Sequence, residues 1–321
     1  MNILITSAGQ RVSLVNSFKK ELTNICRKGS VFTTDLNPEL APACHISDKS
    51  FKVPKVTDDK YIVALLNICL DNNVKMIVPT IDTELHVLSL NIDNFKKKGI
   101  DIIVSGCSFV EICRDKRKVN DLFVNKGIDI PKQFDLNELS FPVFVKPYDG
   151  SRSEGIFTAF EPKDITDQHL DDKKLMFMEY VPSEDYDEFT IDCYYDKKSQ
   201  LRCVVPRKRI HVRAGEVNKG VTKNNFIVKE FQEKLSILEG AKGCLTIQVF
   251  LHKSLDVIKG IEINPRFGGG YPLTYLAGAN YTKWLIEEYL LNRKIDYFDE
   301  WEDNLLMLRY DAEVLVSDYQ Q

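Results

Sequence analysis

A carboxylate, an amide and a guanidinium follow one another in the stretch Ile258 to Leu273, which reads IKGIEINPRFGGGYPL. Because side chains alternate along a strand, Glu262 and Asn264 would point the same way, opposite to the isoleucines beside them. Arg266 adds a fixed cation, and the glycines after it let a backbone approach a ligand closely. Mg²⁺ shares oxygen ligands with phosphates, and arginine suits phosphate oxygens. The stretch predicts a site for Mg²⁺ and a polyphosphate, although a strand ending in a polar turn would look the same.

The first hundred residues must hold part of such a site. Apolar strands are expected over residues 2–6, 31–34, 75–79 and 100–104, with helical segments between them. This alternation predicts a parallel sheet with helices on both faces. Ligands of such sheets bind beyond the carboxyl ends of the strands, and polar residues stand there: Ser7, Arg11, Asp35, Asp82 and Glu84. The three-glycine dinucleotide fingerprint is absent, which argues against a nicotinamide enzyme.

The pattern of predicted strands and helices changes after Ser108. Residues 109–126 predict one helix or two helical turns, and apolar strands are expected over residues 141–147 and 175–181. The loop 149–156 between them could cradle phosphates through its backbone amides, or be a plain hairpin turn. Alternating strands are expected over residues 188–195, 201–216, 243–251 and 304–316, with helices over 226–240 and 281–292. The second half therefore predicts a largely antiparallel sheet.

Composition narrows the class of protein. Hydrophobic residues make up 44% and charged residues 28% of 321, which is typical of a soluble globular chain. The net charge of −4 argues against a nucleic-acid partner, and no apolar run approaches the ~18 residues of a membrane span. We expect no signal peptide, since the chain enters a strand at once. Eight cysteines without a CxxC pair favour a reduced, cytoplasmic compartment and argue against a zinc site.

The order of these pieces resembles the ATP-grasp superfamily, and most closely the ligases similar to the large subunit of carbamoyl phosphate synthetase. The matching segments are RDKRKVNDLF, VFVKP, DGSRSEGI, MEYV, EFTID, IQVF and EINPRFGGG. The resemblance implies an α/β fold of three parts: a Rossmann-like domain (1–108), a small ATP-grasp lobe with the phosphate loop (109–185), and a large lobe with the metal and substrate site (186–321).

The resemblance also implies ATP and Mg²⁺ as cofactors and gives residues roles. Phosphates would meet Lys116, Lys146 and the loop residues Ser151, Ser153 and Gly155. Adenine would lie against Glu179, Tyr180 and Val181, and the ribose against Glu188. Mg²⁺ would bind Glu262 and Asn264. Gln248 stands where a second acidic ligand is expected, so the number of metal ions stays open.

The implied reaction joins a carboxylic acid to an amine through an acyl phosphate. Arg266, Arg213 and Lys146 are the predicted catalytic residues. The acid and the amine would bind among Arg11, Asp82, Arg207, Arg209, Gly268 and Gly269, although structural ion pairs would explain such arginines equally well. Two alternatives remain: a carboxylase or carbamoyl-phosphate-type enzyme that phosphorylates bicarbonate, and a nucleotide-binding protein without catalysis. The predicted partners are small molecules, without nucleic acid or membrane, and a homodimer is left open.

Overall fold

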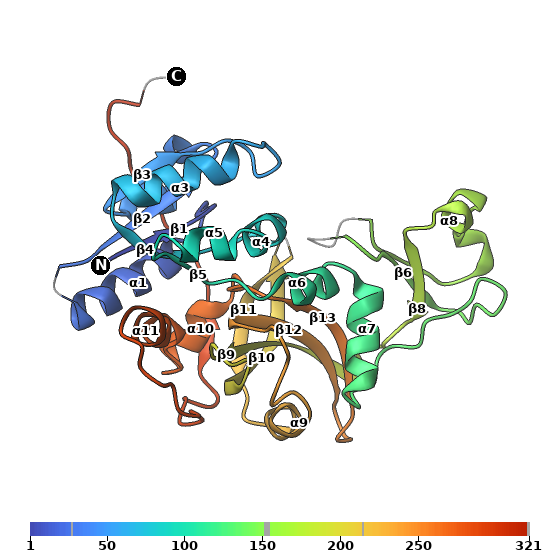
Figure 1. Cartoon of the computed structure of the whole chain (residues 1–321). Coiled ribbons are helices and arrows are strands. Elements are labelled where there is room, and N and C mark those ends of the chain that lie inside the picture. The colour runs from blue at the N-terminus through green and yellow to red at the C-terminus, as the bar shows by residue number, and fades with distance from the viewer. Residues whose placement is uncertain (27, 151–154, 214, 320–321) are drawn as a thin grey trace.

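The computed structural model describes residues 1–26, 28–150, 155–213 and 215–319. The elements of these residues form three sheets of five, six and three strands. In Figure 1 the five-stranded sheet and the six-stranded sheet lie close together, whereas the three-stranded sheet projects to one side. The predicted α/β architecture, a Rossmann-like domain followed by two α+β lobes, is confirmed.

The front sheet is parallel, in the order β3-β2-β1-β4-β5. Its strands are β1 (Asn2–Ile5), β2 (Ser30–Asp35), β3 (Lys49–Lys52), β4 (Val74–Val78) and β5 (Asp101–Ile102). Its helices are α1 (Val12–Ile25), η1 (Pro38–Leu40), α2 (Pro42–Ile46), α3 (Tyr61–Asp71), α4 (Asp82–Ser89) and α5 (Ile92–Lys96). Buried Glu84 accepts hydrogen bonds from Ser7 Oγ, Tyr61 Oη and the amide of Thr80. These bonds fix the loops at the carboxyl end of the sheet, from which Arg11 and Asp82 extend.

Two short helices lead from the front domain to the rest of the chain, α6 (Cys107–Cys113) and α7 (Lys116–Asn125). The Asp115 carboxylate accepts from the Arg117 amide at the start of α7, which is a normal N-cap. Phe123 of α7 lies where a Cβ on Gly260 would stand, 2.4 Å from Phe123 Cδ2. The glycine therefore lets α7 pack directly on the strand that carries Glu262.

The small lobe is a three-stranded antiparallel sheet in the order β7-β6-β8. Its elements are β6 (Val143–Pro147), β7 (Phe157–Ala159), η2 (Pro162–Asp164), α8 (Asp167–Asp171) and β8 (Leu175–Glu179). Val143, Val145 and Phe177 form a small core of their own. Apolar residues of α6 and α7, such as Phe109 and Phe123, belong instead to the main core.

The large sheet is antiparallel, in the order β13-β12-β9-β10-β11-β14. Its strands are β9 (Tyr186–Tyr195), β10 (Leu201–Arg213), β11 (Glu216–Thr222), β12 (Gly243–His252), β13 (Ile258–Asn264) and β14 (Leu306–Leu308). Its helices are α9 (Phe226–Lys234), α10 (Tyr271–Leu276), α11 (Tyr281–Leu285) and the π-helical turn η3 (Ile286–Leu290). None of the described helices is long and apolar enough to cross a membrane.

One hydrophobic core joins the front domain to the large sheet. The Phe18 ring of α1 meets the Phe267 ring edge-on, with centroids 6.1 Å apart. Behind it, Tyr194 and Tyr281 pack against Trp284, with centroids 5.4 and 5.1 Å away. The front domain and the large lobe are therefore packed together as one body.

Several predicted elements are shorter in the structure. The helix expected over residues 226–240 ends at Lys234. The strand expected over residues 304–316 pairs only over Leu306–Leu308, although its partner β11 continues as far as Glu216. The helix expected over residues 281–292 is α helical only to Leu285 and then widens into the π-helical turn.

Candidate active site

One face of the large sheet carries a block of polar side chains. In the strand register, Gln248 pairs with both Thr190 and Glu262, and Thr246 pairs with both Asp192 and Asn264. Directly paired residues in antiparallel strands share a face, so two polar rows cross β9, β12 and β13. The alternation that predicted Glu262 and Asn264 on one side thus extends across three strands. Asn264 Nδ2 donates to Glu262 Oε1 at 2.8 Å, which leaves the amide oxygen as the atom of Asn264 that can bind a cation.

Two lysines from other elements approach Glu262. Lys116 Nζ, at the start of α7, lies 3.9 Å from Glu262 Oε2 and donates to the Gly150 carbonyl. Lys146, on β6, is only 7% exposed. The pKa of Lys146 is lowered to about 8, chiefly by burial and also by the charge of Lys116, while Glu262 opposes the lowering. The structure therefore brings Lys116, Lys146 and Glu262 together.

Arg266 links this strand end to the front domain. Its Nε donates to Asp82 Oδ1 at 2.8 Å, and its Nη2 donates to the other oxygen of the same carboxylate. Burial works against the charge of Arg266, but Asp82 raises the pKa of its guanidinium above the ordinary value. A bidentate pair of this kind fixes the plane of the guanidinium. Arg266 is thus held in one orientation next to Glu262 and Asn264.

Glu216 and two more arginines lie beside the Asp82–Arg266 pair. Arg11 Nη1 is 3.2 Å from Glu216 Oε1, and Arg309 Nη1 is 3.1 Å from Glu216 Oε2. Burial lowers the pKa of Arg11, and although Glu216 counteracts it, the charges of Arg266 and Arg309 add to the lowering. Three arginines and two carboxylates thus form one cluster, composed of Arg11, Asp82, Glu216, Arg266 and Arg309.

Glu188 and Arg209 lie on the same side of the sheet. Arg209 Nε is 3.2 Å from Glu188 Oε1. Burial raises the pKa of Glu188, Arg209 opposes this, and the nearby charge of Glu262 adds to the rise. Glu188 is therefore close enough to Glu262 for the two carboxylates to affect each other.

Glu179 stands at the end of β8, where the small lobe meets the large one. Its carboxylate accepts from the Lys132 amide and from Lys259 Nζ, at 2.9 and 2.5 Å. Lys259 is on β13, so this ion pair ties the two lobes together. Tyr180 and Val181 follow at once and are half-buried.

The other two predicted arginines differ in their surroundings, since Arg207 lies on the polar face beside Thr190 and Asp192, whereas Arg213 lies at the exposed end of β10. Arg207 is 1% exposed and pairs with buried Asp192, Nη2 to Oδ1 at 2.9 Å. It is one of the structural ion pairs that the sequence left open as an alternative. Arg213 has a side chain that is 59% exposed and makes a bidentate pair with Asp311. The structure does not bring Arg213 into contact with the residues around Glu262.

The glycine loop after Arg266 is pressed against the sheet. A Cβ on Gly268 would stand 2.8 Å from Thr246 Oγ1, and one on Gly269 would stand 2.3 Å from Glu216 Cδ. In the phosphate loop, Gly155 has φ +70°, which favours glycine, whereas Ser151 and Ser153 lie outside the described residues.

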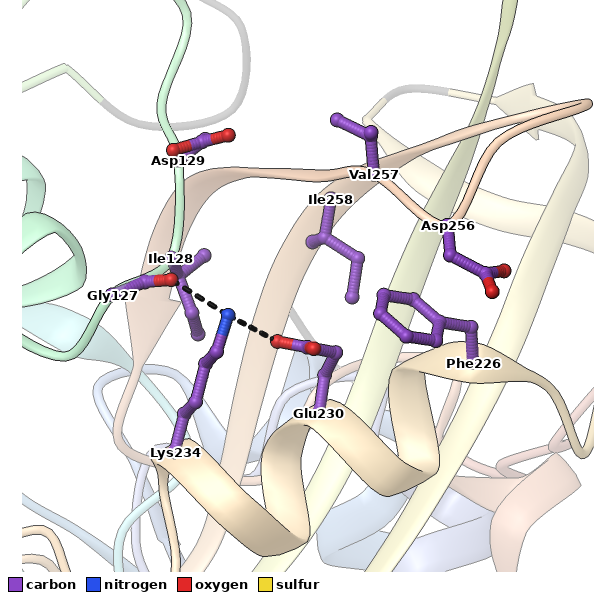
Figure 2. Close-up of a pocket in the computed structure, with 9 residues that line it drawn as sticks. All are labelled: Gly127, Ile128, Asp129, Phe226, Glu230, Lys234, Asp256, Val257 and Ile258. Carbon is purple, nitrogen blue, oxygen red and sulfur yellow. Dashed lines mark hydrogen bonds and ion pairs between the residues drawn. The ribbon is translucent and has the colours of Figure 1, made fainter.

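A cavity of about 80 Å³ lies apart from these groups, between the segment after α7, helix α9 and the start of β13 (Figure 2). Lys234 Nζ reaches the Gly127 carbonyl at 2.8 Å and the Glu230 carboxylate at 2.5 Å, and so spans one side of it. None of the predicted site residues that the structure describes lines this cavity, so the chemistry is to be sought at the polar face of the sheet.

Comparison with protein families gave two matches. Residues 3–103 match the family described as "PylC-like, N-terminal domain", and residues 171–310 match "ATP-grasp in the biosynthetic pathway with Ter operon". The second match assigns residues 171–310 to an ATP-grasp family. A search of curated proteins gave no significant match to this chain.

Solved ATP-grasp structures share the fold of this chain at low identity. The biotin carboxylase domain of the Hydrogenobacter thermophilus 2-oxoglutarate carboxylase, solved with MgADP, ADP and bicarbonate, matches with a TM-score of 0.71 and 14% identity, over 95% of this chain and 73% of that one. The L-amino acid ligase of Bacillus licheniformis matches with a TM-score of 0.65 and 18% identity, over 90% and 74%. The N5-carboxyaminoimidazole ribonucleotide synthetase of Thermotoga maritima matches with a TM-score of 0.64 and 19% identity, over 95% and 79%.

Sequence reasoning missed three charged residues of the site. Glu216 and Arg309 belong to the arginine and carboxylate cluster, and Lys259 pairs with Glu179. Glu216 appeared in the sequence only as the end of a predicted strand segment, residues 201–216. No local pattern marks Lys259 or Arg309, because Lys259 meets Glu179 across the two lobes and Arg309 meets Glu216 through the pairing of β14 with β11.

Proposed function

We propose that this protein is an ATP-dependent carboxylate–amine ligase that works through an acyl phosphate with Mg²⁺. The observation that carries the proposal is the meeting of Lys116, Lys146 and Glu262, which come from α7, β6 and β13. Lys116 and Lys146 both approach Glu262, and a triphosphate bound through a metal ion would balance the positive charge of the two lysines. Phosphoryl transfer depends on such positioning and charge neutralisation more than on covalent chemistry by the protein.

The donor set around Glu262 fits Mg²⁺. One carboxylate, the amide oxygen of Asn264 and the nearby amide of Gln248 are hard oxygen ligands, and Mg²⁺ takes its remaining ligands from water and phosphate. Bound there, Mg²⁺ would neutralise charge on the phosphate oxygens. Glu188 is a second carboxylate near Glu262, and it stands where a further metal ligand or a ribose contact could form.

The nucleotide would lie between the small lobe and the polar face of the large sheet. We place adenine against Tyr180 and Val181, whose backbone can read an uncharged base by hydrogen bonds. Glu179, already held by Lys259, would position that segment. Lys116 and Lys146 would hold the phosphates, and the loop around Ser151, Ser153 and Gly155 would cover them.

In the first step, an oxygen of the substrate carboxylate attacks the γ-phosphorus, and the bond to the bridging oxygen of ADP breaks. In the second step, the amine nitrogen attacks the acyl carbon, and phosphate leaves with the electron pair of the C–O bond while the nitrogen loses a proton. We assign Arg266 to the transferred phosphoryl group, because Asp82 fixes its guanidinium beside Glu262. The same position suits the acyl phosphate. No side chain needs to act as a covalent nucleophile.

The acid and the amine would bind at the cluster of Arg11, Glu216 and Arg309, beside Gly268 and Gly269. Guanidinium groups suit a carboxylate, and the carboxylates Asp82 and Glu216 suit an ammonium group. Arg209 lies closer to the ribose side, with Glu188. We favour Arg266 over Arg213 as the catalytic arginine, because Arg213 is exposed and paired with Asp311.

The test measures ADP release in the presence of Mg²⁺ across panels of acids and amines, with products followed by mass spectrometry. We expect release that requires both an acid and an amine, with an amide as product. Glu262→Gln should lower turnover by about a hundredfold or more, since it removes the metal carboxylate. The matched control is Glu233→Gln, on the exposed face of α9, which should leave turnover unchanged.

Other results would point to the rival functions. ADP release with bicarbonate alone would favour the carboxylase or carbamoyl-phosphate alternative. Nucleotide binding without turnover across the panels would favour a non-catalytic protein. ADP release of equal rate with neither substrate present would count against ligation.

A further inference from the structure

Three side chains of different chemistry meet on the surface between α4 and α6. His86 comes from α4, and Cys107 and Glu111 come from α6. His86 Nε2 lies 3.4 Å from Glu111 Oε1, and Cys107 Sγ lies 3.7 Å from the same oxygen. The three ligand atoms are all within 4.8 Å of one another.

Helix geometry explains how the group forms. Cys107 and Glu111 are four residues apart on α6, so their side chains lie on one face of that helix. The α4 helix packs against α6 and places His86 opposite that face. Cys107 and Glu111 therefore have a fixed spacing on α6, and the packing of α4 against α6 brings His86 next to them.

The distances match those of a tetrahedral site. With Zn–N and Zn–O bonds of about 2.0–2.2 Å and a Zn–S bond of about 2.3 Å, the edges of a ZnNOS tetrahedron are about 3.3–3.6 Å. The two edges that meet at Glu111 Oε1, 3.4 Å to His86 Nε2 and 3.7 Å to Cys107 Sγ, are close to these values. The remaining edge, from nitrogen to sulfur, needs only a rotation of side chains that are partly exposed.

We propose that His86, Cys107 and Glu111 form a binding site for a borderline divalent transition metal of the Zn²⁺ class. Imidazole and thiolate are ligands that Zn²⁺ and Co²⁺ accept, whereas Mg²⁺ prefers oxygen ligands only. The site therefore differs in ligand chemistry from the Mg²⁺ site at Glu262. The Glu111 side chain is 51% exposed and that of His86 is 33% exposed, so water can take the fourth position.

The metal would join two parts of the chain. His86 lies one turn after Asp82 on α4, and Asp82 holds Arg266. A metal bridging α4 and α6 would fix the front domain to the helix pair that leads to the small lobe. It would also restrain the helix that carries Asp82. The site does not depend on the ligase proposal, because it needs no nucleotide or acid.

A plain surface ion pair between His86 and Glu111, with Cys107 as a bystander, is the competing explanation. Replacement of the Cys107 thiol distinguishes the two explanations. A metal site needs thiolate coordination, whereas an ion pair is indifferent to replacement of the sulfur.

The experiment titrates Co²⁺ into the full-length protein after treatment with a chelator. We expect one equivalent of Co²⁺ to bind with a thiolate-to-cobalt charge-transfer band in the near ultraviolet, and Zn²⁺ to abolish that band by displacement. Cys107→Ser should remove the band. His86→Ala and Glu111→Gln should each weaken Co²⁺ binding by about tenfold or more. Zn²⁺ should raise the melting temperature of the wild type but not of Cys107→Ser, since a ligand stabilises only the fold that binds it.

Matched controls are Cys26→Ser, a partly exposed cysteine at the end of α1, and His45→Ala, an exposed histidine on α2. Both should bind Co²⁺ as the wild type does. A wild type without the charge-transfer band, or a band of full strength in Cys107→Ser, would overturn the proposal. The same would follow if the two controls lost as much affinity as the site variants.

Discussion

The charge on Lys146 is the residue-level property with the clearest consequence. Its pKa of about 8 lies below the ordinary value of 10.5, because burial penalises the ammonium form. Between these two values the unfolded chain binds more protons at this residue than the folded one does. Lys146 therefore makes stability rise with pH from about 8 to about 10.5, and its full penalty applies below that window. At neutral pH the folded protein therefore keeps a buried ammonium group at Lys146, which an anionic partner would stabilise.

A bound nucleotide should supply that partner. We predict that ATP raises the pKa of Lys146, so that binding near pH 8.5 takes up a fraction of a proton. Calorimetry in two buffers of different ionisation enthalpy measures this uptake. ATP affinity should also fall as pH rises past about 8 in the wild type. Lys146→Arg should bind ATP without either effect, since arginine stays protonated in this range. Equal proton uptake in both proteins would assign the titration to another group.

The Asp82–Arg266 pair can be tested by comparison with a second bidentate pair. Asp82→Asn keeps the shape but loses the charge that orients the guanidinium, and we expect kcat to fall by about tenfold. Arg266→Lys cannot make two parallel hydrogen bonds and should lower kcat by about a hundredfold.

Arg213→Lys changes the exposed pair with Asp311 in the same chemical way and decides between the two predicted catalytic arginines. If Arg266 is the catalytic one, Arg213→Lys should stay within about twofold of the wild type. A collapse of turnover in Arg213→Lys alone would return the catalytic role to that residue.

At the residue scale, alternation sufficed to place Glu262 and Asn264 on one face, because the rule depends only on neighbours in a strand. The approach of Lys116 and Lys146 to Glu262 could not come from local pattern, since it joins residues more than a hundred positions apart. Lys116 and Lys146 were instead predicted from the resemblance to a known family. Neither source marked Arg309 or Lys259, whereas Arg213 was predicted from the resemblance of its segment to related ligases.

At the scale of elements, the glycine loop before α10 depends on the absence of a side chain. A Cβ on Gly270 would stand 2.0 Å from Arg207 Nη1 and 2.6 Å from Val217 Cγ1. Arg207 cannot move aside cheaply, because it is buried and paired with Asp192. Gly270 has φ −88°, so the backbone itself accepts any residue. The constraint is therefore space, not conformation.

We predict that Gly270→Ala destabilises the protein by about 1–3 kcal/mol through overpacking, and lowers turnover because the loop leaves the sheet. Gly106→Ala is the matched control, since its Cβ would meet Gly240 at an ordinary 3.7 Å and its φ is −58°. Denaturant unfolding gives the free energy of unfolding of both variants. Equal stabilities would show that Arg207 yields more readily than its burial indicates.

Strand and helix ends were predicted less well than their existence. The run NLLMLRYDAEVLV has the composition of a strand, but only Leu306–Leu308 pair with β11, although β11 continues as far as Glu216. Where a strand ends depends on pairing with a distant segment, which local composition does not contain. Likewise, the apolar period of residues 281–292 indicates a helix but contains no sign of the wider π-helical turn at Ile286–Leu290.

At the scale of the whole molecule, the three sheets are not equally independent. The front domain and the large lobe share one core, whereas the small lobe has a core of its own and projects from them (Figure 1). The resemblance to a known family predicted the order of these parts. It could not predict the shared core, because that depends on which face of α1 meets α10.

Hydrogen exchange should separate the two bodies. Phe18→Ala removes the ring that meets Phe267 and should lower the free energy of unfolding by about 3–5 kcal/mol. Exchange should become faster in both the front sheet and the large sheet. Phe177→Ala, in the small-lobe core, should accelerate exchange in β6, β7 and β8 only. Faster exchange confined to the front sheet in Phe18→Ala would show that the shared core is not cooperative.

The aromatic cluster behind the large sheet has a practical consequence. The two tryptophans of the chain, Trp284 and Trp301, both lie in the large lobe, and Trp301 is buried. Intrinsic fluorescence excited at the indole rings would therefore report the melting of that lobe and remain silent about β6–β8. A circular dichroism signal that changes at a lower temperature than the emission would reveal the small lobe opening first, without any label having been attached.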